Sequence, residues 1–406
     1  MYVIRLIPIL VFGFILYKAI KRKNKVSITI IGLYFLSSFS SLFINSENLR
    51  LHDFNSDSFF SFLIYTLILA CFLSLTFLVK PYSNVKQLPN GKLYNLIQII
   101  FILGSLYSLF YLSPYAIKSL LISALELRTD MQIYGLKVLP ESIFTTIAVG
   151  FPSFYFVYCF MFFISIVKKQ KLFILLNLVG PIAFIINVLT VSGRDGVILT
   201  FFAFILTFFL FENLINSNIK KRLKKVFILG FSIAFIPIFF ITIDRFSKSE
   251  EFNFNTLNKG IISYIGVQPF VFADNIQDEN PIFNYGANSF PLFTTSEVVT
   301  NKKFYSGLFG TFLVAFYKVS GYSSLILISL IFYLLFFLIL KLNNRYSVLS
   351  MVFFLSLFFH FIITGIFYFR LGTKGGNLYL VLSLLIFFIL RNTRKNKNLN
   401  EKYANN

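Results

Sequence analysis

Long runs of apolar residues, separated by short polar segments, extend over almost the whole chain. A helix needs about 20 mainly apolar residues to cross a bilayer, and eleven segments come close to that length. The sequence therefore predicts an all-α polytopic membrane protein with about 11 transmembrane helices and one large outer loop. The predicted spans are 2–20, 26–45, 59–79, 93–113, 143–167, 172–191, 196–213, 226–243, 322–340, 346–369 and 376–390.

The segments between these spans alternate in charge. One alternate set is short and basic, and it contains 23 of the 37 Lys and Arg residues but only Glu212 and Glu401 of the acidic ones. The other set has no net charge, so the whole formal charge of +21 lies on one side. Basic loops remain in the cytoplasm, which predicts an outer N-terminus, an uncleaved first helix and a cytoplasmic C-terminus.

The amino-acid composition excludes two other classes of protein. Hydrophobic residues make up 57% of the chain and charged residues only 13%, which excludes an ordinary soluble domain and a disordered chain. Orientation in the membrane explains the positive charge, so nucleic-acid binding is not expected. Cys71 and Cys159 both lie in apolar spans, and no nucleotide-binding or metal-binding motif is present.

The predicted spans divide the chain into four parts. Residues 1–243 form helices 1–8 with short loops, 244–321 a large extracytoplasmic loop with surface helices, 322–390 helices 9–11, and 391–406 a basic cytoplasmic tail. Within the large loop, 308–321 is interpreted as a helix on the outer membrane surface, because a further span would place the basic segment after 340 outside. An amphipathic surface helix is also expected within the outer loop at 114–142.

Several outer motifs together carry a family resemblance. The turn Val191-Ser192-Gly193-Arg194-Asp195-Gly196 precedes an apolar span, and Arg245 opens the large loop, which continues with Ile262-Ser263-Tyr264, Pro269 and Tyr285-Gly286. With its many spans and late outer loop, the chain resembles O-antigen (Wzy-type) polymerases, that is, oligosaccharide repeat unit polymerases. The Arg-x10-Gly motif of some members is not met, since Ile205 and Thr256 stand at the glycine positions. A ligase of the same type would use a histidine in the large loop, which contains none.

The resemblance implies a bacterial cytoplasmic-membrane glycosyltransferase that joins undecaprenyl-diphosphate-linked glycans on the outer face. Its product would be an O-antigen, a capsule or another exopolysaccharide. A chain-length regulator and a flippase are the protein partners it implies, beside the lipid bilayer. No cofactor and no metal are expected, because arginines can balance the charge of the departing diphosphate.

Cations at the outer ends of spans are the candidates for that role. Arginine binds phosphate oxygens through two parallel hydrogen bonds and stays charged, so Arg194, Arg245 and Arg370 are the predicted diphosphate clamp. Lys374 and Arg128 are predicted to bind the lipid-linked substrate. The structural alternative for each is a side chain that only reaches toward lipid headgroups.

Carboxylates and aromatic rings complete the candidate site. A base must accept the proton of the attacking sugar hydroxyl, and Asp195 is the first choice, with Asp274 and Asp53 as alternatives. Tyr264 and Tyr285 are predicted to stack on sugar rings, although packing inside the loop is the common role of such residues. His360 and Asn187, within spans, are interpreted as packed polar side chains.

Three other functions remain open from the sequence. A flippase or transporter of lipid-linked oligosaccharides would need broken helices in the middle of the membrane, and no paired Gly or Pro interruptions are visible. Another outer-face glycosyltransferase or ligase is kept open by Asp53 and Asp57 in the first outer loop. A purely structural membrane protein would not need the cluster of outer arginines.

Overall fold

The computed structural model describes residues 2–44, 58–85, 88–121, 138–191, 193, 195–247, 262, 265–278, 283–294 and 310–391. Helices account for the regular structure of these residues, with one isolated bridge between Thr311 and Tyr368. The chain forms two compact units. Unit 1 comprises Met1–Lys80, Asn253–Arg345 and His360–Leu380; unit 2 comprises Pro81–Phe252, Tyr346–Phe359 and Val381–Asn406.

Eight helical segments in the described part are long and apolar enough to cross a membrane, and each coincides with a predicted span. The predicted spans 346–369 and 376–390 contain shorter apolar helices, α16 (Val348–Thr364) and α17 (Lys374–Leu390). The span 226–243 lies in α11 (Ser217–Ser247). The chain is thus a multi-pass membrane protein, and the number of eleven spans stays a prediction. The eight segments are Val3–Lys21, Lys25–Phe43, Ser58–Leu78, Lys92–Leu121, Ile143–Val167, Lys171–Leu189, Asp195–Leu214 and Tyr322–Lys341.

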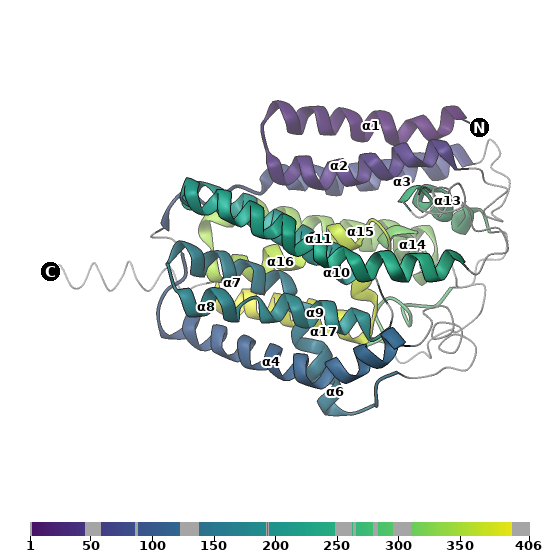
Figure 1. The fold of residues 1–406 in the computed structure, drawn as a ribbon. Coiled ribbons are helices and arrows are strands. Elements are labelled where there is room, and N and C mark those ends of the chain that lie inside the picture. Colours follow the sequence, from purple (N-terminus) through teal and green to yellow (C-terminus); the bar gives the residue numbers. More distant parts are fainter. Residues whose placement is uncertain are drawn as a thin grey trace. The chain divides into compact units, whose positions relative to one another are not determined.

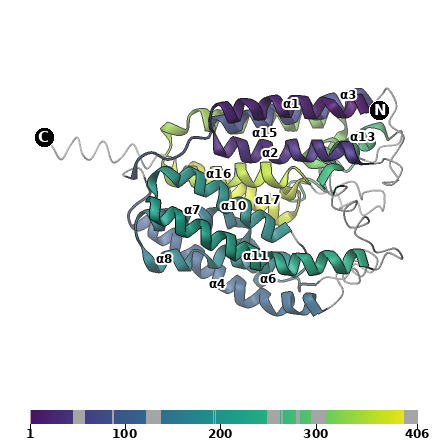
Figure 2. The ribbon, with the colours of Figure 1, turned by 45° about the horizontal axis from the view of Figure 1, so that its top comes forward.

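In unit 1, α1 (Tyr2–Lys21) lies beside α2 (Lys25–Ser40) and α3 (Ser58–Ser74) (Figures 1 and 2). The turn between α1 and α2 ends at Asn24, whose side chain accepts a hydrogen bond from Ser27 N at 3.1 Å. This N-cap satisfies one of the amides that a helix start leaves without an intrahelical partner. A short polar sequence is therefore enough to reverse the chain.

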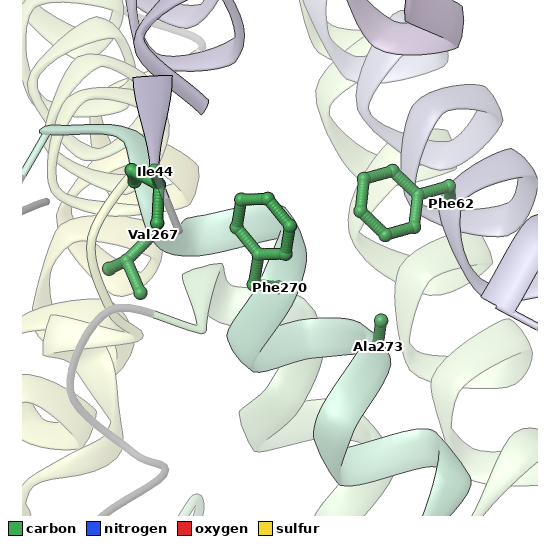
Figure 3. Packing of buried hydrophobic residues seen from close by; sticks show 5 residues of the cluster. All are labelled: Ile44, Phe62, Val267, Phe270 and Ala273. Atoms are coloured by element: carbon green, nitrogen blue, oxygen red, sulfur yellow. The ribbon is translucent and has the colours of Figure 1, made fainter. Parts of the chain in front are cut away.

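A short helix of the large loop packs into unit 1. α13 (Gln268–Gln277) starts with Pro269 in its first turn and buries Phe270 against α3. The Phe270 and Phe62 rings meet edge to face with centroids 5.8 Å apart, in a cluster with Ile44, Val267 and Ala273 (Figure 3). Part of the predicted loop thus belongs to the core of this unit.

The segment interpreted as a surface helix is helical but differs from that interpretation. Seven of the ten residues of α14 (Thr311–Ser320) are buried, so most of its circumference is covered by other parts of the protein. Phe312 contacts Phe72 and Phe361 at 5.1 and 4.6 Å between ring centroids. A helix on the membrane surface would leave one side exposed, whereas α14 packs among the helices of unit 1, beside α15 (Tyr322–Lys341).

Unit 2 contains α4 (Lys92–Leu121), α6 (Ile143–Gly150), α7 (Tyr155–Val167), α8 (Lys171–Leu176), α9 (Val179–Leu189), α10 (Asp195–Phe211) and α11. α4 lies along α9 (Figure 1). The close approach of α9 to α7 depends on glycine, because a Cβ at Gly180 would lie 2.2 Å from the ring of Tyr158.

The helix α4 is longer than the predicted span 93–113. It continues through Pro114 to Leu121, so the first residues of the predicted outer loop extend this helix rather than starting a separate one. Ala116 packs on Leu189, and Ser119 Oγ donates to Thr190 O at 2.5 Å. Contacts with α9 therefore support the last two turns despite the proline.

Candidate functional site

The predicted site residues are distributed over both units. Arg128, Arg194, Tyr264 and Asp53 lie outside the described residues. Arg245 lies in the last turns of α11, and its side chain is likewise not described. Of the remaining candidates, Arg370, Lys374, Tyr285 and Asp274 belong to unit 1 and Asp195 to unit 2.

A non-helical segment between α16 and α17 carries Arg370. α16 ends at Thr364, a short 3₁₀ turn spans Arg370–Gly372, and α17 begins at Lys374. The half-buried Arg370 donates from Nη1 to the Tyr368 hydroxyl at 3.0 Å. Its charge also acts on His360, whose ring lies 5.1 Å from that of Tyr379 between centroids. The hydrogen bond to Tyr368 thus fixes the guanidinium at this turn.

The start of α17 adds a second positive feature. Thr373 Oγ1 accepts from Gly376 N at 2.9 Å, and Thr373 O accepts from Asn377 N at 2.8 Å. The amides of Lys374 and Gly375 stand in the first turn, where a helix offers no internal acceptor. Lys374 is exposed, and a Cβ at Gly375 would contact nothing in the described structure. This helix end therefore presents amides, a partial positive charge and an ammonium group to solvent.

Asn377 joins this helix start to the large loop. Its buried amide donates to Ser289 O at 3.2 Å and to Leu371 O at 2.5 Å, while its oxygen accepts from Leu292 N at 3.3 Å. Segment 283–294 is consequently tied to the turn that carries Arg370. Sequence reasoning missed Asn377; the only signal was an amide side chain in the first turn of an apolar helix.

Tyr285 projects from that same loop segment. Asn284 N and Tyr285 N donate to Lys318 O and Val319 O at 2.9 and 3.0 Å, so the backbone is fixed on α14. Tyr285 has φ +47° and is followed by Gly286 with φ +90°. The left-handed turn leaves the Tyr285 side chain 70% exposed. An exposed ring on a fixed backbone favours the predicted stacking role over packing inside the loop.

Lys318 in α14 has two acidic residues, Asp274 and Asp278, as electrostatic neighbours. Lys318 is buried, and burial lowers its pKa, while the charges of Asp278 and Asp274 act in the opposite direction. Asp274, an alternative base, thus has an electrostatic partner in unit 1. Lys318 was not singled out from the sequence, because its neighbours in α14 are mainly apolar.

The glycines in the turn before α10 pack closely against Val188. The glycines beside Arg194 were interpreted as room for a ligand, but a Cβ at Gly193 would lie 2.5 Å from Val188 Cγ1. At Gly196 it would lie 2.8 Å from Val188 Cβ. Gly193 N also donates to Val188 O at 3.0 Å, so the glycines serve helix packing. Asp195 is half-buried at the start of α10, where a carboxylate is favoured.

Metal ligands do not gather in the part of the chain that the structure describes: no group of three or more His, Cys, Asp or Glu residues is positioned to hold an ion. The apolar helices define a multi-pass membrane protein. In unit 1, Arg370, Lys374 and Tyr285 form a basic, partly aromatic group. Comparisons with protein families, curated proteins and solved structures find no match to the chain.

Proposed function

We propose that this protein is a membrane glycosyltransferase that polymerises undecaprenyl-diphosphate-linked repeat units on the outer face of the bacterial cytoplasmic membrane. The observation that carries the proposal is the arrangement around Asn377. Its hydrogen bonds keep Arg370, Lys374 and the start of α17 next to the segment that presents Tyr285. Cations for a diphosphate and an exposed ring for a sugar thus belong to one structural unit.

The reaction explains why these groups are needed. A hydroxyl oxygen of the acceptor glycan attacks the anomeric carbon of the donor, and the bond from that carbon to the lipid diphosphate breaks. The diphosphate leaves with the bonding electrons, so fixed positive charge stabilises the transition state. In the proposal Arg370, Lys374 and the α17 amides of unit 1 supply that charge.

The acceptor hydroxyl loses its proton in the same step. Asp195 remains the first choice for the base from the sequence, and Asp274, whose charge acts on Lys318 in unit 1, is the alternative. A carboxylate at either position can take the proton directly or through one water molecule. Arg128, Tyr264 and Tyr285 are proposed to bind the lipid-linked glycans, and a chain-length regulator and a flippase remain proposed partners.

The deciding experiment is a glycan profile of a deletion strain complemented with variants. Arg370→Ala should give single repeat units at the cell surface and no polymer ladder. Arg345→Ala, in an exposed turn after α15, removes an equal charge and should retain the ladder. Long chains of normal length from well-expressed Arg370→Ala protein would remove Arg370 from the proposed site.

A flippase or transporter of lipid-linked oligosaccharides is the second candidate. One observation favours it: α16 ends at Thr364 inside unit 1, and the non-helical backbone after it accepts hydrogen bonds at Gly365 O and Phe367 O from Phe312 N and Thr311 N. Transporters use such interrupted helices. In that case the deletion strain would lack surface-exposed single units, whereas loss of a polymerase, or of another outer-face glycosyltransferase or ligase, would leave them in place.

A further inference from the structure

A buried group of polar side chains lies where α4, α7 and the turn between α8 and α9 meet in unit 2. Gln98, Ser165 and Asn177 have no exposed surface, and Tyr94 is 1% exposed. Gln98 Nε2 and Asn177 Nδ2 both donate to Ser165 Oγ, at 3.1 and 3.2 Å. Ser165 therefore connects three helical segments through one hydroxyl oxygen.

The hydrogen bonds of this group are incomplete. Within the described residues, Gln98 Oε1 and Asn177 Oδ1 have no hydrogen-bond partner, and Tyr94 Oη, whose polar neighbour is the Ser165 hydroxyl, has none within hydrogen-bond distance. A polar atom that is buried without a partner loses its hydrogen bonds to water and therefore destabilises the folded state. Native interiors pair nearly all such atoms with protein or with ordered water. Two acceptors and one hydroxyl therefore require a small polar partner.

We propose that this group binds an ordered internal water molecule. Such a water donates to the two amide oxygens, Gln98 Oε1 and Asn177 Oδ1, and accepts from the hydroxyl of Tyr94. Buried waters typically make about three hydrogen bonds to groups that are otherwise unsatisfied. One molecule thus completes the pairing of all three atoms.

A monovalent cation fits the site less well. Lys168 Nζ lies 4.5 Å from the centroid of the Tyr94 ring and donates to Pro89 O. A second positive charge in this low-dielectric surrounding would be repelled by the ammonium group. It would also leave the Tyr94 proton without an acceptor, which a water molecule provides.

The position of the water gives it a structural role. Helix α8 ends at Leu176, and α9 begins after Asn177 and Leu178. Pro181 in the first turn of α9 has no amide hydrogen, so it offers no backbone donor at this break. A water held by Asn177 stabilises this break. The far end of α9 leads to the turn that contains Gly193 and Asp195.

Hydroxyl-radical footprinting of the full-length protein tests the proposal, because radiolysis generates radicals from internal waters in place. Tyr94 should be modified several-fold faster than Tyr158, which is also fully buried in unit 2. Tyr158 is a matched control because its hydroxyl donates to Phe101 O at 2.8 Å. Equal, slow modification of both tyrosines would show that the site is dry and overturn the proposal.

A variant and an ion exchange identify the occupant. Gln98→Leu with Asn177→Leu removes both amide oxygens and should lower the modification of Tyr94 to the rate of Tyr158. The wild-type comparison stands if this variant fails to fold. Replacing Na+ and K+ by choline should leave the melting temperature unchanged. A stabilisation by either ion that is lost in Asn177→Leu would instead assign a cation to the site and refute water.

Discussion

The side-chain amide of Asn377 donates a hydrogen bond to the main-chain carbonyl of Ser289, 88 positions earlier in the chain, across 3.2 Å. This contact joins the first turn of α17 to the large loop. With the bonds to Leu371 O and from Leu292 N, it fixes the loop segment to the turn of Arg370. The proposed site therefore depends on a residue that need not touch substrate.

Replacing Asn377 should separate these two segments. Asn377→Leu leaves Ser289 O and Leu292 N without their buried partner, and we expect a loss of roughly 2–4 kcal/mol in unfolding free energy. Thermal unfolding in detergent measures the stability, and the glycan ladder measures the function. Leu378→Ala, at the next and partly exposed position, is the control and should change both little. An Asn377→Leu protein with normal stability and a normal ladder would contradict this role.

Close packing of α4 predicts opposite effects for two glycine substitutions. A Cβ at Gly104 would lie 2.4 Å from ring atoms of Phe151, whereas at Gly230 in α11 it would meet nothing within 4 Å in the described structure. Gly104→Ala should thus destabilise the protein by about 1–3 kcal/mol through overpacking. Gly230→Ala should be neutral or stabilise it by up to about 1 kcal/mol through helix propensity. Equal melting temperatures for both variants would argue against the close contact.

How much the sequence could predict depends on the range of the interaction. The eight long apolar segments were predictable because hydropathy over about 20 residues is a local property. The burial of α14 was not predictable. An apolar stretch of ten residues has the same sequence pattern whether it contacts lipid or, as here, Phe72 and Phe361. Asn377 was missed because its partners at 289 and 292 are far away in sequence. The proposed roles of Arg370 and Tyr285 stay predictions, although the structure places both in unit 1.

Arg5 should prove essential to the stability of unit 1. It is 4% exposed, donates to Ser41 O at 3.2 Å and to Ile44 O at 2.7 Å, and lies 4.6 Å from the centroid of the Phe270 ring. Arg5→Ala removes these bonds at the end of α2, and we expect it to cost roughly 3 kcal/mol. Arg5→Lys keeps the charge but not the planar fork, so partial recovery is expected. Full recovery by Lys, measured by thermal unfolding, would show that charge alone matters.

The orientation of the chain is the premise of the proposed chemistry, and two exposed positions test it. Tyr285→Cys and Lys224→Cys are introduced singly after Cys71→Ser, since Cys71 is exposed and Cys159 is buried. Because basic segments remain inside, the cysteine at 285 should react with a membrane-impermeant thiol reagent in intact spheroplasts. The cysteine at 224 should react only after permeabilisation, which serves as the control for its accessibility. The reverse pattern would place Tyr285 and Arg370 in the cytoplasm, where a polymerase of the proposed kind has no substrate.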